Sequence, residues 1–270
     1  MGRLGVRWCV GDVSDFGFEA LRLSIWGARK VFGPDVRYVV CVNSVPVDRV
    51  REAISPVPAG VEWRDVSAEL PGWLRRDVFD RRLAYGVGWK LAPLQVFPDC
   101  HELALDNDVV LWEEPAAVRR WREDPDEACC LAEDATLYFG RFAALCGSEP
   151  LSSGVRGLPP GFDLEGALRR VLAEVPGRLI GPADEQGLQV AALRPYPLHV
   201  VHTDELTVCS FAPSHQQHLG TCGAHFVDLN KKRFPGRGRE EELRRLRDHW
   251  RRVRASVYEK VGIAPARQPA

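Results

Sequence analysis

Two aspartates separated by one residue, Asp106 and Asp108, are the side chains in this sequence best suited to chemistry. They directly follow the apolar run 101–105, which predicts a buried strand that ends at the pair. In open α/β sheets ligands gather beyond the carboxyl ends of the strands, so acids at this place can meet an ion or a substrate. Carboxylate oxygens suit Mg²⁺ or Mn²⁺, which keep open positions for water and substrate phosphates. The pair predicts a site for a metal-bound diphosphate, with an ordinary polar turn as the alternative.

A second group of metal-ligand side chains lies near the C-terminal end. It comprises His215, His218, Cys222 and His225, with Cys209 upstream. Imidazole and thiolate suit zinc, but the spacing is not one of the common zinc-finger patterns. A dedicated zinc site is therefore an alternative hypothesis, which metal analysis of protein purified without added zinc would decide.

The elements that must position these residues are predicted by hydrophobic periodicity and turn residues. A strand at 7–10, a helix over 18–31 and a strand at 36–42 make a βαβ opening with parallel strands. Further helices are predicted over 46–54, 89–97, 162–174, 183–193 and 238–260, and further strands at 61–63, 101–105 and 128–131. This order predicts an α/β fold with a Rossmann-like mixed sheet flanked by helices and a basic C-terminal helix.

Composition sets the class of protein and its surroundings. The 270 residues have a formal net charge of −1, which excludes a nucleic-acid coat, and the eight cysteines form no CxxC pair. With no secretory leader and no apolar run long enough to span a membrane, we expect a cytoplasmic protein. We expect one main domain over residues 1–236, an amphipathic helix over 237–263 and a disordered tail over 264–270.

The C-terminal helix carries a narrow apolar stripe of residues spaced three and four apart, from Leu243 to Val257. Its other faces are crowded with arginine, and Lys231, Lys232 and Arg233 precede it. The ordinary interpretation is a solvated helix face. The alternative is a peripheral contact with anionic lipid at the inner membrane face, or with a phosphorylated acceptor.

The order of short segments resembles the GT-A glycosyltransferases, particularly the glycogenin-like and bacterial lipopolysaccharide-type sugar transferases. The matching segments, which span most of the chain, are Trp89-Lys90-Leu91, Asp106-Asn107-Asp108, Ser152-Ser153-Gly154-Val155, Asp184-Glu185-Gln186 and Gly223-Ala224-His225-Phe226. Each segment is short, and their shared order is what carries the resemblance. Two features depart from the family pattern: Ser152 stands where the family has asparagine, and Lys231 or Lys232 lies outside the usual K-P-W context.

The resemblance implies a metal and diphosphate site. Asp106, Asp108 and His225 would bind Mn²⁺ or Mg²⁺, and Asp106 and Asn107 would also meet the nucleotide donor. Lys90 and Lys231 would place positive charge on the diphosphate and stabilise it as a leaving group. A packed histidine and solvated lysines are the structural alternatives.

The resemblance also implies contacts for the base and for the sugars. Val10, Gly11 and Asp12 follow the first strand, where this fold receives the nucleotide base, although a simple turn explains them too. Asp184 and Glu185 would address the acceptor or the donor sugar, as a hydroxyl-orienting group or a general base. Acids in the first turn of a helix are also favoured by the helix dipole.

Three functions compete on these observations. The first is metal-dependent transfer of a sugar from a nucleotide diphosphate sugar, with a UDP-sugar as the expected donor, to an unidentified acceptor hydroxyl. The second is a haloacid-dehalogenase-type phosphatase with Asp106 as nucleophile, which normally has this motif on its first strand. The third is a non-catalytic module that binds a nucleotide sugar or scaffolds a carbohydrate-synthesis complex.

Overall fold

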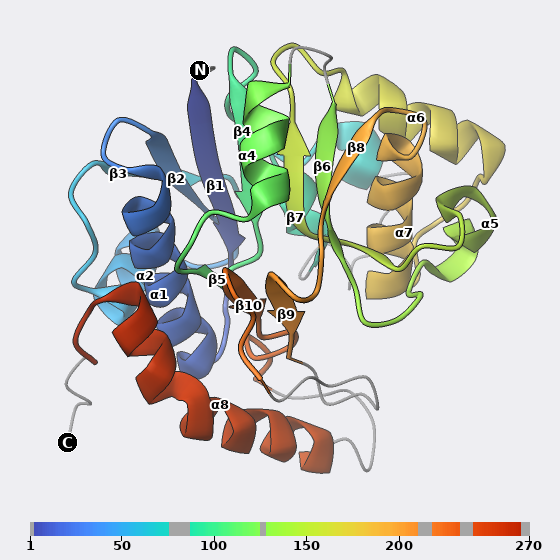
Figure 1. The fold of residues 1–270 in the computed structure, drawn as a ribbon. Coiled ribbons are helices and arrows are strands. Elements are labelled where there is room, and N and C mark those ends of the chain that lie inside the picture. Colours follow the sequence, from blue (N-terminus) through green and yellow to red (C-terminus); the bar gives the residue numbers. More distant parts are fainter. Residues whose placement is uncertain (1–2, 76–86, 125–127, 210–217, 233–239, 266–270) are drawn as a thin grey trace.

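The computed structural model describes residues 3–75, 87–124, 128–209, 218–232 and 240–265, which form a mixed sheet flanked by helices (Figure 1). Its seven strands lie in the order β3-β2-β1-β4-β7-β6-β8, and β7 runs antiparallel to both neighbours. They are β1 (Leu4–Val10), β2 (Arg37–Val42), β3 (Val61–Asp65), β4 (His101–Leu105), β6 (Cys129–Glu133), β7 (Leu151–Leu158) and β8 (Leu198–Val201). The predicted mixed α/β sheet and its parallel βαβ opening are confirmed.

A small second sheet, with the order β5-β10-β9, lies beyond the carboxyl end of β4. It consists of β5 (Val109–Leu111), β9 (Leu206–Val208) and β10 (Gly223–His225). β10 pairs antiparallel with β5 and parallel with β9. The small sheet thus joins a segment just after the paired aspartates to one more than a hundred residues later.

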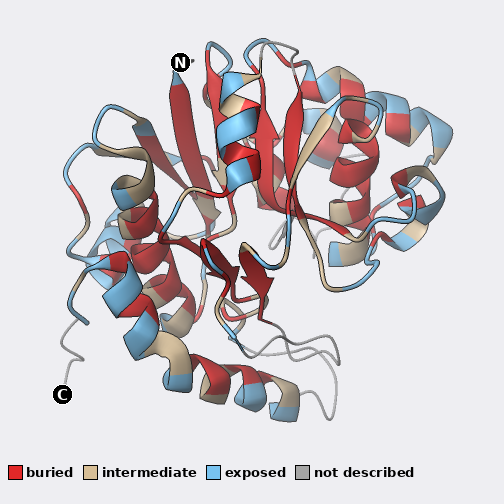
Figure 2. Ribbon diagram, viewed as in Figure 1, coloured by how far each residue is buried: buried red, intermediate tan, exposed pale blue. Residues whose placement is uncertain are grey.

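The helices cover the two faces of the main sheet and bury its strands (Figure 2). The α-helices are α1 (Asp15–Phe32), α2 (Val47–Ile54), α4 (Ala116–Glu123), α5 (Ala143–Cys146), α6 (Leu164–Glu174), α7 (Pro182–Leu193) and α8 (Glu240–Val261), and the 3₁₀ helices are η2 (Val87–Leu91) and η3 (Gly140–Phe142). Trp8 and Val40 belong to a core with α1, α2 and α4, whereas Val39 and Cys41 belong to a core with α6 and α7. This alternation along β2 is the period-two pattern of a strand buried on both faces.

Helix α1 also fixes the small sheet through a very close approach. A Cβ atom at Gly27 would lie 2.0 Å from the carbonyl oxygen of Leu111, so only glycine lets α1 pack this closely on β5. The strand that directly follows Asp108 is therefore held against a long helix. Its position depends little on the flexibility of the loop before it.

Helix α8 packs on its own chain and does not extend into solvent. Leu246, Trp250 and Val257 are buried in a third core with α1 and the small sheet, and the rings of Trp250 and Phe226 meet edge to face. The Trp250 indole N–H donates to Glu19 at 2.9 Å. The apolar stripe thus supports the strand that carries His225, while residues 266–270 of the expected tail lie outside the described residues.

One predicted helix is wrong over most of its length. The segment 89–97 forms the 3₁₀ helix η2 only as far as Leu91 and then turns. Pro93 lacks the N–H that a helix would need there, and Pro98 follows the segment. Among the described residues, no helix is long and apolar enough to cross a membrane.

Candidate active site

Asp106, Asp108 and His225 come together at the junction of the two sheets. Asp106 follows β4, Asp108 precedes β5, and the pairing of β10 with β5 places His225 opposite Val109. The backbone N–H of Phe226 donates to the carbonyl of Asp108 at 2.9 Å, which fixes this register. One ligand atom from each of the three side chains lies within 4.8 Å of the others.

The three side chains fit a divalent cation in chemistry as well as in spacing. His225 Nε2 lies 3.4 Å from Asp108 Oδ1 and 3.7 Å from Asp106 Oδ2. Burial raises the pKa of Asp108 against the opposing effect of the hydrogen bond from His225. Burial would lower the pKa of His225, but the hydrogen bond and charge of Asp108 outweigh it and raise that pKa. The buried acid Asp108 and the half-buried acid Asp106, with an imidazole beside them, suit Mn²⁺ or Mg²⁺.

Gly154 makes room for the imidazole of His225. Its carbonyl accepts a hydrogen bond from the N–H of Asp106 at 2.8 Å, so β7 runs directly past the site. A Cβ atom at Gly154 would lie 2.5 Å from Cε1 and 2.8 Å from Nδ1 of His225. In the Ser152-Ser153-Gly154 segment, the absence of a side chain at Gly154 leaves space for His225, and the Ser152 hydroxyl accepts a hydrogen bond from the N–H of Gly154 at 3.1 Å.

We expect Gly154→Ala to weaken Mn²⁺ binding about tenfold or more, which corresponds to about 1.4 kcal/mol, because the methyl group displaces His225. Calorimetric titration with Mn²⁺ measures this. Gly181→Ala is the matched control, since a Cβ atom there meets nothing within 4 Å and its φ of −155° suits any residue. Equal Mn²⁺ affinity in the two variants would contradict the placement of His225.

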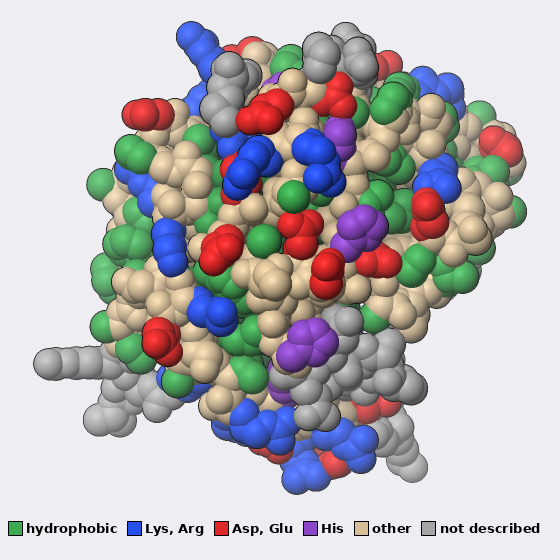
Figure 3. Space-filling view, viewed as in Figure 1, with side chains coloured by type: hydrophobic (Ala, Val, Ile, Leu, Met, Phe, Trp, Pro, Cys, Tyr) green, Lys and Arg blue, Asp and Glu red, His purple; other side chains and the backbone are tan. Residues whose placement is uncertain are grey.

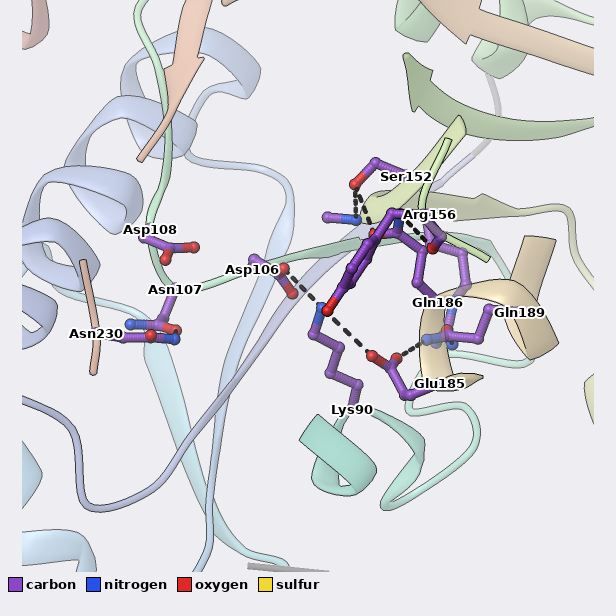
Figure 4. A network of polar contacts seen from close by, with 12 residues as sticks. Lys90, Asp106, Asn107, Asp108, Ser152, Arg156, Glu185, Gln186, Gln189 and Asn230 are labelled. Carbon is purple, nitrogen blue, oxygen red and sulfur yellow. Dashed lines mark hydrogen bonds and ion pairs between the residues drawn. The ribbon is translucent and has the colours of Figure 1, made fainter. Parts of the chain in front are cut away.

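Lys90 bridges the aspartate cluster and Glu185 (Figure 4). Its Nζ donates to Asp106 Oδ2 at 2.7 Å and lies 4.0 Å from Glu185 Oε2. Burial alone would lower the pKa of Lys90, but attraction to Asp106 and Glu185 outweighs it and raises the pKa. Burial raises the pKa of Glu185 to about 7, although Lys90 opposes the shift. A fixed positive charge and a carboxylate that titrates near neutrality thus stand side by side.

Asp184 has a different environment from its neighbour Glu185. Its Oδ1 accepts from the backbone N–H of Arg141 at 2.9 Å, and its Oδ2 accepts from that of Ile180 at 2.7 Å. The side chain is buried, and both of its oxygens hold backbone segments that flank α7. The two acids predicted for catalysis therefore separate, and only Glu185 contacts Lys90.

The residues predicted for the nucleotide lie around the carboxyl end of β1. Asp12 pairs with Lys232 at 2.6 Å and with Arg49 at 3.4 Å, while Lys231 pairs with Asp228. Lys232, which the sequence offered only as an alternative to Lys231, is thus the lysine that contacts the β1 turn. Val10 and Gly11 both contact Asn43. The Asn43 side chain donates to the carbonyl of Val10, and a Cβ atom at Gly11 would lie 2.7 Å from Asn43 Oδ1.

Asn107 is buried between the aspartates and is hydrogen-bonded to Asn230 and to the backbone of α1. Its Oδ1 accepts from Asn230 Nδ2 at 3.2 Å, and its Nδ2 donates to the carbonyl of Gly17 at 3.4 Å. These contacts hold the Asp106-Asn107-Asp108 turn against α1. The side chain is engaged within the protein, which favours a positioning role for it.

The alternative zinc group is not assembled in the part of the chain that the structure describes. His225 belongs to the aspartate cluster, and no other set of three metal-ligand side chains comes together within the described residues. Cys209 is buried, and Cys222 is buried beside Thr221 and Glu205. His215 lies outside the described residues.

The sequence did not predict a cluster of four buried polar side chains that lies beside the site. Arg7, Glu102, Arg156 and Gln189 are buried and connect to Lys90 and Glu185. A cavity of about 20 Å³, lined by Arg7, Lys90, Asp106 and Arg156 among others, lies between them. The available signal was a charged residue inside each of the two predicted strands at 7–10 and 101–105, which is unusual for a buried strand.

Solved structures of glycosyltransferases share this fold. The galactosyltransferase LgtC, solved with donor and acceptor sugar analogs, is 11% identical over 92% of this chain and 99% of its own, with a TM-score of 0.54. The bifunctional glycosyltransferase WbbM is 14% identical over 98% of this chain and 50% of its own, with a TM-score of 0.56. Mouse xyloside xylosyltransferase 1 is 13% identical over 84% of this chain and 98% of its own, with a TM-score of 0.52.

These likenesses establish the fold as the GT-A type, in agreement with the sequence-based prediction. No family model matches the sequence, and comparison with curated proteins gave no match. At such low identity a shared fold does not by itself carry a shared activity.

Proposed function

We propose that this chain is a metal-dependent glycosyltransferase that moves a sugar from a nucleotide diphosphate sugar to an acceptor hydroxyl. The observation that carries the proposal is the Asp106, Asp108 and His225 cluster with Lys90 beside it, at the carboxyl end of β4 in a GT-A fold. A UDP-sugar is the donor we propose, with its base near Val10, Gly11 and Asp12.

The residues of the site divide the work of such a reaction. A divalent cation held by the cluster would offset charge on the diphosphate as its bond to the sugar breaks. Lys90 supplies a second positive charge close to the same place. Glu185 is the carboxylate we propose for the reacting centre, whereas Asp184 holds the adjoining loops and acts through them.

The position of Asp106 argues against the phosphatase alternative. A haloacid-dehalogenase-type nucleophile stands on the first strand of its fold, but Asp106 follows β4 and is paired with Lys90. Trapping a phosphoaspartate at Asp106 would reverse this ranking.

Titration with a panel of nucleotide sugars in the presence of Mn²⁺, followed by a product assay, tests the proposal. We expect one donor to bind only with the metal and to be hydrolysed or transferred. Metal-dependent binding without any product would favour the non-catalytic module. Absence of binding by every donor would contradict both.

A peripheral contact with anionic lipid through α8 is a separate proposal. Lys and Arg side chains gather over this helix (Figure 3), which supports it. Several are already paired in place, however: Arg244 and Arg245 with Glu241, and Arg251 with Asp248. Sedimentation with anionic and neutral vesicles would test it, and equal binding to the two would contradict it.

A further inference from the structure

A buried carboxylate, Glu102, lies at the centre of the cluster of buried polar side chains beside the site. Its Oε1 is 3.2 Å from Arg7 Nε and 3.9 Å from Arg156 Nη2, and all three side chains are almost completely buried. Its Oε2 accepts from the backbone N–H of Val96 and of Phe97. Glu102 thus holds two guanidinium groups, one on β1 and one on β7.

Each of these arginines reaches toward one side of the proposed reaction centre. Arg7 Nη2 donates to the carbonyl of Lys90 at 2.5 Å, and Arg7 Nη1 donates to that of Pro93 at 2.6 Å. Arg156 Nη1 donates to Gln189 Oε1 at 2.5 Å, and Gln189 Nε2 donates to Glu185 Oε1. Figure 4 shows the chain from Arg156 through Gln189 to Glu185 and Lys90.

The chemistry of Arg156 decides which way the Gln189 amide points. A guanidinium can only donate hydrogen bonds, so the amide oxygen must face Arg156. The amide NH₂ must then face Glu185 and can only donate to it. The ionised form of Glu185 accepts at both oxygens, so it satisfies this contact through Oε1 and presents a negative Oε2 to Lys90.

Charge in the cluster also favours this arrangement. Two buried guanidiniums share the single carboxylate of Glu102, and burial together with Arg7 lowers the pKa of Arg156 to about 10. Negative charge on Glu185 contributes to balancing the surplus at Arg156. Replacing a buried ionic cluster by apolar side chains is often neutral for stability. Stability alone therefore does not explain why these hydrogen bonds lead to Lys90 and Glu185.

We propose that Gln189 and Arg156 are positioning residues that hold Glu185 toward Lys90 for the reaction. The inference rests on the proposed function, in which Glu185 and Lys90 act on the donor. It predicts that loss of the amide disturbs Glu185 without disturbing donor binding at the metal.

The test is Gln189→Met, which keeps the length of the side chain but removes the donor to Glu185. We expect the kcat of donor turnover to fall about tenfold or more while KM for the donor changes less than about threefold. We also expect the acidic limb of the pH profile to move to higher pH, because the ionised Glu185 loses a hydrogen bond. The other charged groups that face Glu185, namely Lys90, Asp106 and Arg156, are unchanged in this variant.

Leu188→Ala is the matched control, because Leu188 is the adjacent, fully buried residue of the same helix. It should lower the melting temperature at least as much as Gln189→Met, yet leave the pH limb in place. A similar shift of the limb in both variants, or none in Gln189→Met, would overturn the proposal.

A readout independent of turnover separates this inference from the proposed function. Infrared difference spectroscopy can follow the carboxyl stretch of Glu185 against pH, with Glu185→Gln to assign the band. We expect Gln189→Met to raise that titration. If no donor is turned over but the titration shifts, the function fails and the positioning holds; an unshifted titration overturns the positioning.

Discussion

The variant Asp108→Ala is expected to lose metal-stimulated donor turnover, by about a hundredfold or more. A metal ion at a reacting phosphate contributes several kcal/mol, and each 1.4 kcal/mol is a factor of ten in rate. Asp108 is buried and faces His225, so its removal takes away a ligand and also the partner that orients the imidazole. Steady-state hydrolysis or transfer with and without Mn²⁺, alongside calorimetric titration of Mn²⁺, measures both consequences.

A second aspartate provides the control for folding. Asp163 caps the N-terminus of α6 by accepting from the N–H of Gly166, and α6 packs on the opposite face of the main sheet from α1. Asp163→Ala should lower the free energy of unfolding by about 1 kcal/mol, but its donor turnover should still be stimulated by Mn²⁺. Unchanged turnover in Asp108→Ala, with circular dichroism showing a folded protein, would sink the proposed mechanism.

Much of the main sheet could be predicted because its strands and helices have strong local patterns. The strand at 36–42 is a run of β-branched and apolar residues, and the helix at 162–174 begins at a capping aspartate. The segment 151–158, which became β7, gave no such signal because it is rich in small and polar residues. It is a strand because it lies between β4 and β6, which is a tertiary contact and not a local preference.

The site could be predicted in its ligands but not in their arrangement. His225 was tied to the aspartates only through the order of motifs, since nothing local predicts the three-residue strands of the small sheet. The division between Asp184 and Glu185 could not be predicted either. Both acids occupy the first turn of α7, and only the backbone groups of distant loops distinguish the two environments.

Glu185→Gln is expected to lower kcat by about a hundredfold or more, because general acid–base catalysis by a placed carboxylate typically contributes that much. In the unaltered protein, activity should fall as the pH drops below about 7, where Glu185 takes up a proton. A cation at Asp106 and Asp108 would move this limb to lower pH by favouring the ionised carboxylate. The variant has no carboxyl at this position and should lack the limb, which pH–rate profiles of both proteins would reveal.

The raised pKa of Glu185 lowers the stability of the folded protein at the pH where the carboxylate is active. A group that serves only the structure would instead add stability there. Because burial raises the pKa of Glu185 above the ordinary value of 4.5, the folded chain holds this proton more tightly than the unfolded chain. Its contribution to stability therefore declines as pH rises from about 4.5 to about 7, and is lowest above that. Glu185→Gln should then unfold at an equal or higher temperature at pH 8.

Asp184→Ala should be less stable by about 1–3 kcal/mol, because it leaves the N–H groups of Arg141 and Ile180 without their acceptor. If Glu185→Gln were the less stable of the two, Glu185 would be a structural acid and Lys90 would have to act without it.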